Sequence, residues 1–164
     1  MAVPRQIMEK IKQDFWTSPY NELLDLTESE SNQFLEWFGN TVNKFEISNK
    51  PDEKLINDSN IPGRCFGNSQ IISINNPQEY YEGFVKSKDG FNLHGFNIKN
   101  KTVEDYTVLS NPNNFKDSNG NLPSEYYGIM IPKNFITEHN IQDIETNSYN
   151  ISQLIDKYFK KHRL

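Results

Sequence analysis

The apolar residues at the start of the chain recur with the spacing of an α-helix. A short helix is predicted to begin after Pro4 and to end before the segment TSPYN. Its apolar face carries Ile7, Met8, Ile11 and Phe15.

A second predicted helix begins with a capping box. Thr27 is followed three residues later by Glu30, so each side chain can accept a hydrogen bond from the backbone N–H of the other residue. We expect this helix to extend to about residue 46, because helical spacing continues through Phe34, Leu35, Phe38, Val42 and Phe45.

After the polar connection 48–62, the pattern changes to the alternation of β-strands. Aromatic and β-branched residues alternate with polar ones, and turn sequences at 88–90 and 100–101 separate the segments. A loop is expected at 111–123. The predicted strands are 80–87, 91–100, 101–110 and 125–132.

Helical spacing returns after the last strand. Pro132 is expected at the first position of a short helix, and Ile151, Leu154, Ile155, Tyr158 and Phe159 indicate a final one. The order predicts an α+β fold: N-terminal helices, an antiparallel β-meander of about four strands with one face covered, and C-terminal helices. We expect one domain over 1–164, helical over 1–75, with the sheet over 79–132 and the last helices over 132–164.

Composition narrows the classes of function. The net charge is -5, and the chain has no basic stripe of the kind that binds nucleic-acid phosphates. The basic end KYFKKHRL suits the C-terminal end of a helix. No apolar run approaches the ~18 residues of a membrane span. We therefore expect a cytoplasmic protein that binds neither nucleic acid nor membrane.

The only cysteine is the strongest candidate for chemistry. Cys65 follows the helix-breaking segment IPG and precedes CFGNSQIISI, which is predicted to be helical. Backbone N–H groups at a helix start favour a thiolate, and the adjacent Arg64 would act in the same direction. The alternative is a small buried apolar residue, the usual fate of a free cysteine. With one cysteine and three scattered histidines, we expect neither a metal site nor a cofactor.

His94 lies inside a predicted strand, unlike His139 and His162. A hairpin turning at Asn100–Lys101 places residues opposite each other when their numbers sum to about 201. The partner of His94 is then near 107, and Asp105 is a diagonal neighbour on the same face. Its carboxylate could orient the imidazole, as a catalytic triad requires.

Cysteine at a helix start, then histidine and aspartate on consecutive strands, resembles the papain-like cysteine hydrolase superfamily. The segments GRCFGNS, YYEGF, LHGFNI, VEDYT and YYGIMIP make it most similar to the transglutaminase-like and NlpC/P60-like branches, and to small bacterial and phage proteins with this triad. The resemblance implies that Cys65 is the nucleophile, His94 the general base and acid, and Asp105 the orienting residue.

Further residues are candidates for binding substrate or the oxyanion. No glutamine upstream of Cys65 matches the oxyanion donor of papain, so Asn60 and Asn57 are considered as substitutes, beside the N–H of Cys65. RCFGN is also similar to the nucleophile region of arylamine N-acetyltransferases, whose interval to the histidine is longer. The remaining candidates are Arg64, Asn68, Glu82, which we expect to be exposed beside a bulge at Gly83, and Tyr127 or its neighbour Tyr126.

Two classes of function remain open. The first is a cysteine-dependent hydrolase that attacks an amide or related acyl bond of a peptide or other amide-containing substrate; a variant of it is an acyltransferase. The second is a non-catalytic interaction protein of a phage or bacterium, with a tyrosine-rich surface as its interface.

Overall fold

The structure is a computed structural model that describes residues 3–163. Its N-terminal part contains helix α1 (Arg5–Thr17), a 3-10 turn (Pro19–Leu23) and helix α2 (Glu28–Thr41). The predicted capping box is confirmed. The N–H of Glu30 donates to Thr27 Oγ1, and the N–H of Thr27 donates to Glu30 Oε1, both over 3.1 Å.

Helix α2 is shorter than its apolar pattern predicts. It ends at Thr41, and strand β1 (Asn43–Ile47) follows, so the prediction of a helix to residue 46 is wrong at its end. Gly39 and Asn40 are weak helix formers. Within β1, residues 43–45 pair with β5 and residues 46–47 pair with β4, and this pairing outweighs the local helical spacing of Phe45.

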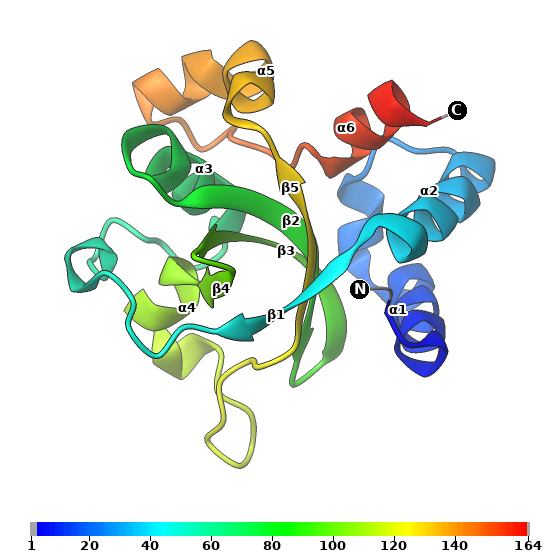
Figure 1. The fold of residues 1–164 in the computed structure, drawn as a ribbon, viewed down its shortest axis with the longest axis horizontal. Helices are drawn as coiled ribbons and strands as arrows, with labels where there is room; N and C mark the ends of the chain where they lie inside the picture. Colours follow the sequence, from blue (N-terminus) through cyan, green and yellow to red (C-terminus); the bar gives the residue numbers. More distant parts are fainter. Residues whose placement is uncertain (1–2, 164) are drawn as a thin grey trace.

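The sheet is a closed barrel of five strands rather than a meander of four (Figure 1). The strands are β1, β2 (Glu79–Ser87), β3 (Gly90–Lys99), β4 (Thr102–Glu104) and β5 (Tyr126–Ile131), in the spatial order β1-β4-β3-β2-β5. β1 runs parallel to β4, whereas the other pairs are antiparallel. The α+β class is confirmed, and the simple antiparallel meander is wrong.

The predicted hairpin between β3 and β4 has the expected register. Asn97 lies opposite Glu104 and Lys99 opposite Thr102, with Asn100 and Lys101 at positive φ in the turn. Strand β4 is much shorter than the predicted strand 101–110, because the chain leaves the sheet at Asp105 and forms helix α4 (Tyr106–Ser110).

The remaining helices cover the barrel from other directions. Helix α3 (Cys65–Asn75) starts where predicted and packs on β3. Pro132 is the N-cap of α5 (Lys133–Thr146), which is longer than the expected short helix and contains His139. The last helix, α6 (Ile155–His162), begins four residues after Ile151, where the predicted apolar pattern starts.

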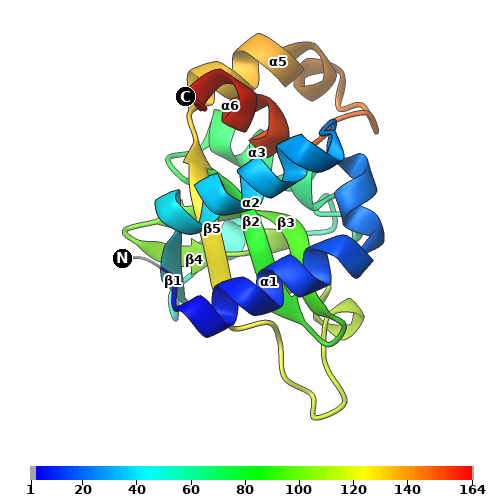
Figure 2. The same cartoon turned by 90° about the vertical axis from the view of Figure 1, so that its right-hand side faces the viewer.

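Two groups of helices enclose the barrel. α1 and α2 lie along one side, with α6 above them, whereas α3 and α4 lie on the opposite side (Figures 1 and 2). An aromatic core joins the first group to the sheet; Phe38 and Phe84 make an edge contact at 5.0 Å between ring centroids. Within 3–163, no helix is both long and apolar enough to cross a membrane.

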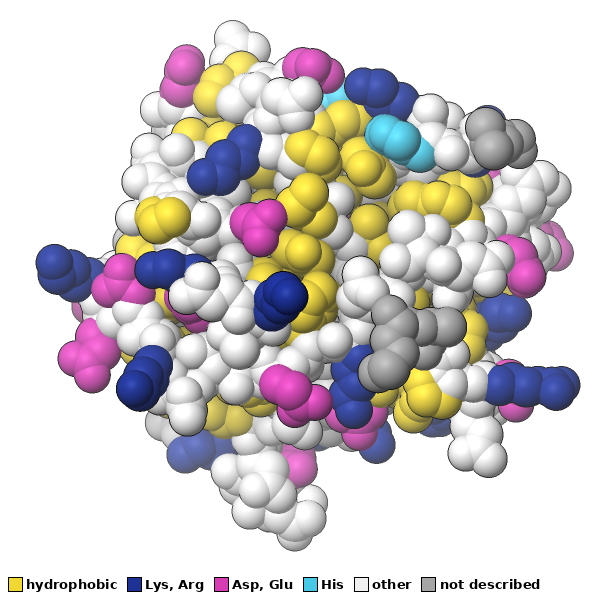
Figure 3. Space-filling view, viewed as in Figure 1, with side chains coloured by type: hydrophobic (Ala, Val, Ile, Leu, Met, Phe, Trp, Pro, Cys, Tyr) yellow, Lys and Arg dark blue, Asp and Glu magenta, His cyan; other side chains and the backbone are white. Residues whose placement is uncertain are grey.

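One face of the molecule carries charges of both signs. Lysine, arginine, aspartate and glutamate side chains are interspersed across the face in Figure 3, around hydrophobic side chains gathered near its centre. Ile47 and Met130 are among the exposed large apolar residues of the chain.

Candidate active site

Cys65 occupies the first position of α3. The side chain of the preceding Arg64 makes no capping hydrogen bond to the helix. The first N–H groups of a helix have no acceptor within it, so they are oriented toward whatever lies at its N-terminus. Cys65 is partly exposed and lines the same cavity as His94. The thiol therefore lies at an open helix start rather than in the core.

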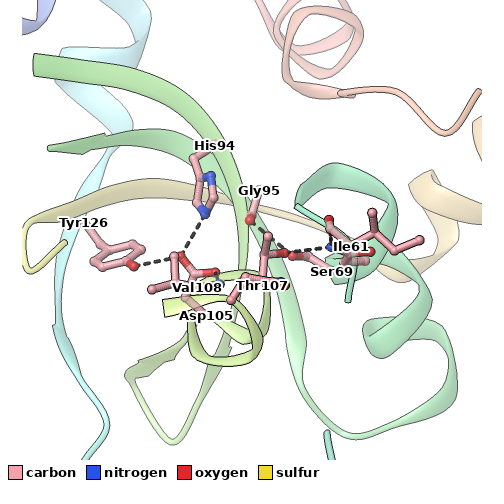
Figure 4. Close-up of polar contacts among 10 residues, drawn as sticks. Ile61, Ser69, His94, Gly95, Asp105, Thr107, Val108 and Tyr126 are labelled. Carbon is pink, nitrogen blue, oxygen red and sulfur yellow. Dashed lines mark hydrogen bonds and ion pairs between the residues drawn. The ribbon is translucent and has the colours of Figure 1, made fainter. Parts of the chain in front are cut away.

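His94 and Asp105 are in direct contact. His94 Nε2 lies 2.7 Å from Asp105 Oδ2, and the two side chains are 12% and 5% exposed (Figure 4). Because Nε2 is engaged by the carboxylate, Nδ1 is the ring nitrogen left for Cys65. A nearly buried carboxylate thus contacts the imidazole at Nε2.

Asp105 reaches His94 by a different route from the one predicted. It is the N-cap of α4, and its Oδ1 accepts a hydrogen bond of 3.3 Å from the N–H of Val108. The buried hydroxyl of Tyr126 donates to Oδ2 over 2.7 Å (Figure 4). Burial and the charge of Asp105 raise the pKa of Tyr126 well above its ordinary value, so Tyr126 stays protonated and donates.

The charges around His94 favour its protonated form. Burial by itself lowers the pKa of His94. The negative charges of Asp105 and of a Cys65 thiolate, together with hydrogen bonds to both side chains, outweigh burial and raise this pKa well above the ordinary value. The surroundings of His94 therefore favour the imidazolium.

A glycine allows α3 to approach β3 closely. A Cβ atom on Gly95 would lie 3.1 Å from Phe66 Cα and 3.0 Å from its ring. Ser69 Oγ donates to the carbonyl of Gly95 over 3.1 Å, and Asn97 Nδ2 donates to the carbonyl of Ser69 over 3.0 Å. These contacts hold the helix of Cys65 on the strand of His94. The sequence pattern does not predict these contacts; the glycine that follows His94 is the feature that could have indicated them.

The cavity beside Cys65 and His94 has a volume of about 420 Å³. Its wall is formed by the start of α3, the β2–β3 hairpin, α4 with the loop after it, and the segment 149–153. The ring of Phe115, from the loop after α4, makes an edge contact with His94 at 6.4 Å between centroids. The sequence alone predicts no role for Phe115.

Asn60 and Asn68 do not face the cavity; both serve structural roles. Asn60 Nδ2 donates to the carbonyl of Leu55 and to Ser110 Oγ, and Asn68 Nδ2 donates to the carbonyl of Ile61 and to Thr107 Oγ1. Both are buried, and they join the segment before Cys65 to α4. Their amide donors are already engaged by these partners.

Arg64 and Tyr127 also have other partners. The Arg64 guanidinium lies over the ring of Tyr149, 3.0 Å from its centroid. Tyr127 is buried in the aromatic core beside Phe91, and neither residue lines the cavity. The tyrosine-rich surface expected of an interaction protein is not observed at Tyr80, Tyr106, Tyr126 and Tyr127, which are all buried. Tyr149, in contrast, is 80% exposed.

Glu82 is fully buried, so the prediction of an exposed residue beside a bulge is wrong. The β2–β3 register passes through Glu82 and Gly83 without interruption. The carboxylate accepts hydrogen bonds from the N–H groups of Leu154 and Ile155, over 2.7 and 3.0 Å, and from the Tyr80 hydroxyl over 2.5 Å. Glu82 therefore holds the start of α6 on the barrel.

Burial of Glu82 makes the stability of the fold depend on pH. Burial raises the pKa of this carboxyl to about 7, against three hydrogen bonds that lower it. The folded chain then holds a proton that the unfolded chain loses above pH 4.5, so stability falls as pH rises toward 7. We expect this carboxyl to contribute a loss of about 2–3 kcal/mol between pH 5 and pH 8.

Urea unfolding of the wild type and of Glu82→Gln at both pH values would measure this dependence. The variant lacks the titrating group, so its free energy of unfolding should fall less over the interval. Equal falls in the two proteins would contradict the assignment to Glu82.

Comparisons with protein-family models, with characterised proteins and with solved structures found no match to this chain. Among the described residues, no three His, Cys, Asp or Glu side chains cluster closely enough to hold a metal ion.

Proposed function

We propose that the protein is a cysteine-dependent acyl hydrolase with a Cys65–His94–Asp105 triad. The observation that carries the proposal is the 2.7 Å contact between His94 and Asp105, in a cavity whose wall also contains the thiol at the start of α3. A structural cysteine has no need of an imidazole oriented by a buried carboxylate.

The chemistry follows from these positions. His94 Nδ1 takes the proton of Cys65, and Sγ attacks the substrate carbonyl. The resulting oxyanion accepts hydrogen bonds from N–H groups in the first turn of α3. As the tetrahedral intermediate collapses, His94 gives its proton to the leaving amine, and an acyl-thioester remains on Cys65. Water, deprotonated by His94, attacks this thioester and releases the acid and the thiol.

The family proposed for the chain is the papain-like superfamily, in its transglutaminase-like or NlpC/P60-like branch. The chain order supports it: Cys65 at the start of α3, then His94 on β3, then Asp105 directly after β4. The substrate is proposed to be a peptide or another amide-containing molecule.

Alkylation of Cys65 by iodoacetamide at pH 6.5 tests the proposal without knowledge of the substrate. We expect the wild-type thiol to react at least about ten times faster than N-acetylcysteine, because an imidazolium stabilises the thiolate. In His94→Ala the alkylation rate of Cys65 should fall to that of N-acetylcysteine or below. His139→Ala is the matched control, because this histidine contacts Phe135 of its own helix and does not line the cavity.

Slow alkylation that is indifferent to His94 would overturn the proposal and favour an interaction protein. If alkylation is fast, mass spectrometry of the acyl-enzyme formed from activated esters distinguishes hydrolysis from acyl transfer. A hydrolase loses the acyl group to water alone, whereas an acyltransferase loses it faster when a primary amine is added.

A further inference from the structure

The wall of the cavity beside Cys65 is mostly apolar. Apolar residues from six separate segments line it: Phe66, Val85, Leu93, Val108, Phe115 and Ile151. Its volume of about 420 Å³ is within the range of small-molecule sites, about 300–1,000 Å³. It is therefore large enough for more than the reacting carbonyl.

Charge is confined to one part of this wall. Setting aside the reacting pair Cys65 and His94, the described residues that line the cavity include only two with charged side chains, Lys88 and Asp89. Both are exposed at the tip of the β2–β3 hairpin, and as neighbours they offset each other. Away from the His94–Asp105 pair, a charged group bound deeper would find no opposite charge, and burying an unpaired charge is costly.

The reacting groups lie in this apolar wall rather than beside it. Cys65 and His94 are both lining residues, Phe66 directly follows the thiol along α3, and Phe115 touches the imidazole ring edge-on. A substrate whose carbonyl reaches Sγ thus brings its adjoining atoms against apolar carbon.

We propose that Cys65 is acylated by substrates that carry an uncharged apolar group next to the reacting carbonyl, and that Phe115 helps to select that group. This inference rests on the proposed function of Cys65 as a nucleophile. Binding removes the apolar group from water. Each methylene that the cavity buries is therefore expected to raise the rate of reaction at Cys65 by up to about four-fold.

Three alkylating agents would test the selection: iodoacetamide, its N-hexyl derivative and its N-(5-carboxypentyl) derivative. Each rate at Cys65 is divided by the rate of the same agent with N-acetylcysteine. We expect the normalised rate of the N-hexyl agent to exceed that of iodoacetamide more than about ten-fold, the gain from two buried methylenes. The carboxylate derivative should lose most of this gain.

Phe115→Asp should reduce the ratio of the N-hexyl rate to the iodoacetamide rate several-fold. The ratio cancels any change in the amount of thiolate, which matters because Phe115 touches His94. Asn119→Asp is the matched control; it adds the same charge to the same loop at an exposed residue outside the cavity wall and should leave the ratio unchanged.

The outcomes separate the two proposals. Fast, His94-dependent reaction with iodoacetamide but equal normalised rates for all three agents would overturn the apolar selectivity and leave the nucleophile in place. A hexyl preference that survives Phe115→Asp would overturn the role of Phe115. Slow reaction with iodoacetamide, unaffected by His94→Ala, would overturn the proposed function and this inference with it.

Discussion

Replacing Asp105 with asparagine is expected to slow acylation of Cys65 by about 10³- to 10⁴-fold. The wild-type carboxylate accepts at both oxygens, from His94 Nε2, Tyr126 and the N–H of Val108. An asparagine can still cap α4 through its carbonyl oxygen, but its amide nitrogen then faces Nε2 as a donor. His94 is thereby held with its proton on Nδ1, where it cannot accept the proton of Cys65.

Acylation by an activated ester, followed by mass spectrometry at pH 7, would measure this loss. Tyr126→Phe is the matched control, because it removes one hydrogen bond to Asp105 and leaves the carboxylate on His94. We expect it to slow acylation much less than Asp105→Asn. A change of less than about three-fold in a folded Asp105→Asn protein would show that this carboxylate does not set the tautomer.

Gly83→Ala is expected to destabilise the fold by about 3 kcal/mol or more. Gly83 lies in β2 between His94 of β3 and Gly128 of β5. A Cβ atom there would be 1.9 Å from the carbonyl oxygen of Tyr127 and 2.6 Å from Gly128 Cα. Both contacts are with backbone, and strands paired on both sides leave little room for movement.

Urea unfolding followed by far-ultraviolet circular dichroism would measure this effect. Gly67→Ala is the control, since a Cβ in α3 would meet Ile151 at 3.4 Å, an ordinary contact, and alanine favours the helix. We expect Gly67→Ala to change stability by no more than about 1 kcal/mol. A loss of less than about 1 kcal/mol in Gly83→Ala would mean that β2 and β5 can move apart.

Local signals in the sequence were sufficient for several elements. Thr27 and Glu30 mark the start of α2 because a capping box involves only neighbouring residues. The turn at Asn100–Lys101 likewise sets the register of β3 with β4. Cys65 begins α3 directly after a helix-breaking segment. These features depend on interactions within a few residues of each other.

Elsewhere the local pattern was misleading because distant partners decide the structure. Phe45 continues the helical spacing of α2 but lies in β1, which is paired with β4 and β5. Tyr106 to Ser110 read as a strand, yet the Asp105 carboxylate caps them as a helix. Glu82 read as exposed, and only the return of the chain at Leu154 and Ile155 provides the donors that make its burial tolerable.

The candidate site divides in the same way. Cys65, His94 and Asp105 can be selected from the sequence, because a helix start and a tight hairpin place each of them locally. Tyr126, Gly95 and Phe115 cannot, since their roles arise from segments that meet only when the barrel closes and α3 packs on β3. The sequence by itself determined the reactive residue types and their order. The tertiary structure decided their distances, their shared cavity and its apolar wall, because these depend on long-range packing that no local spacing encodes.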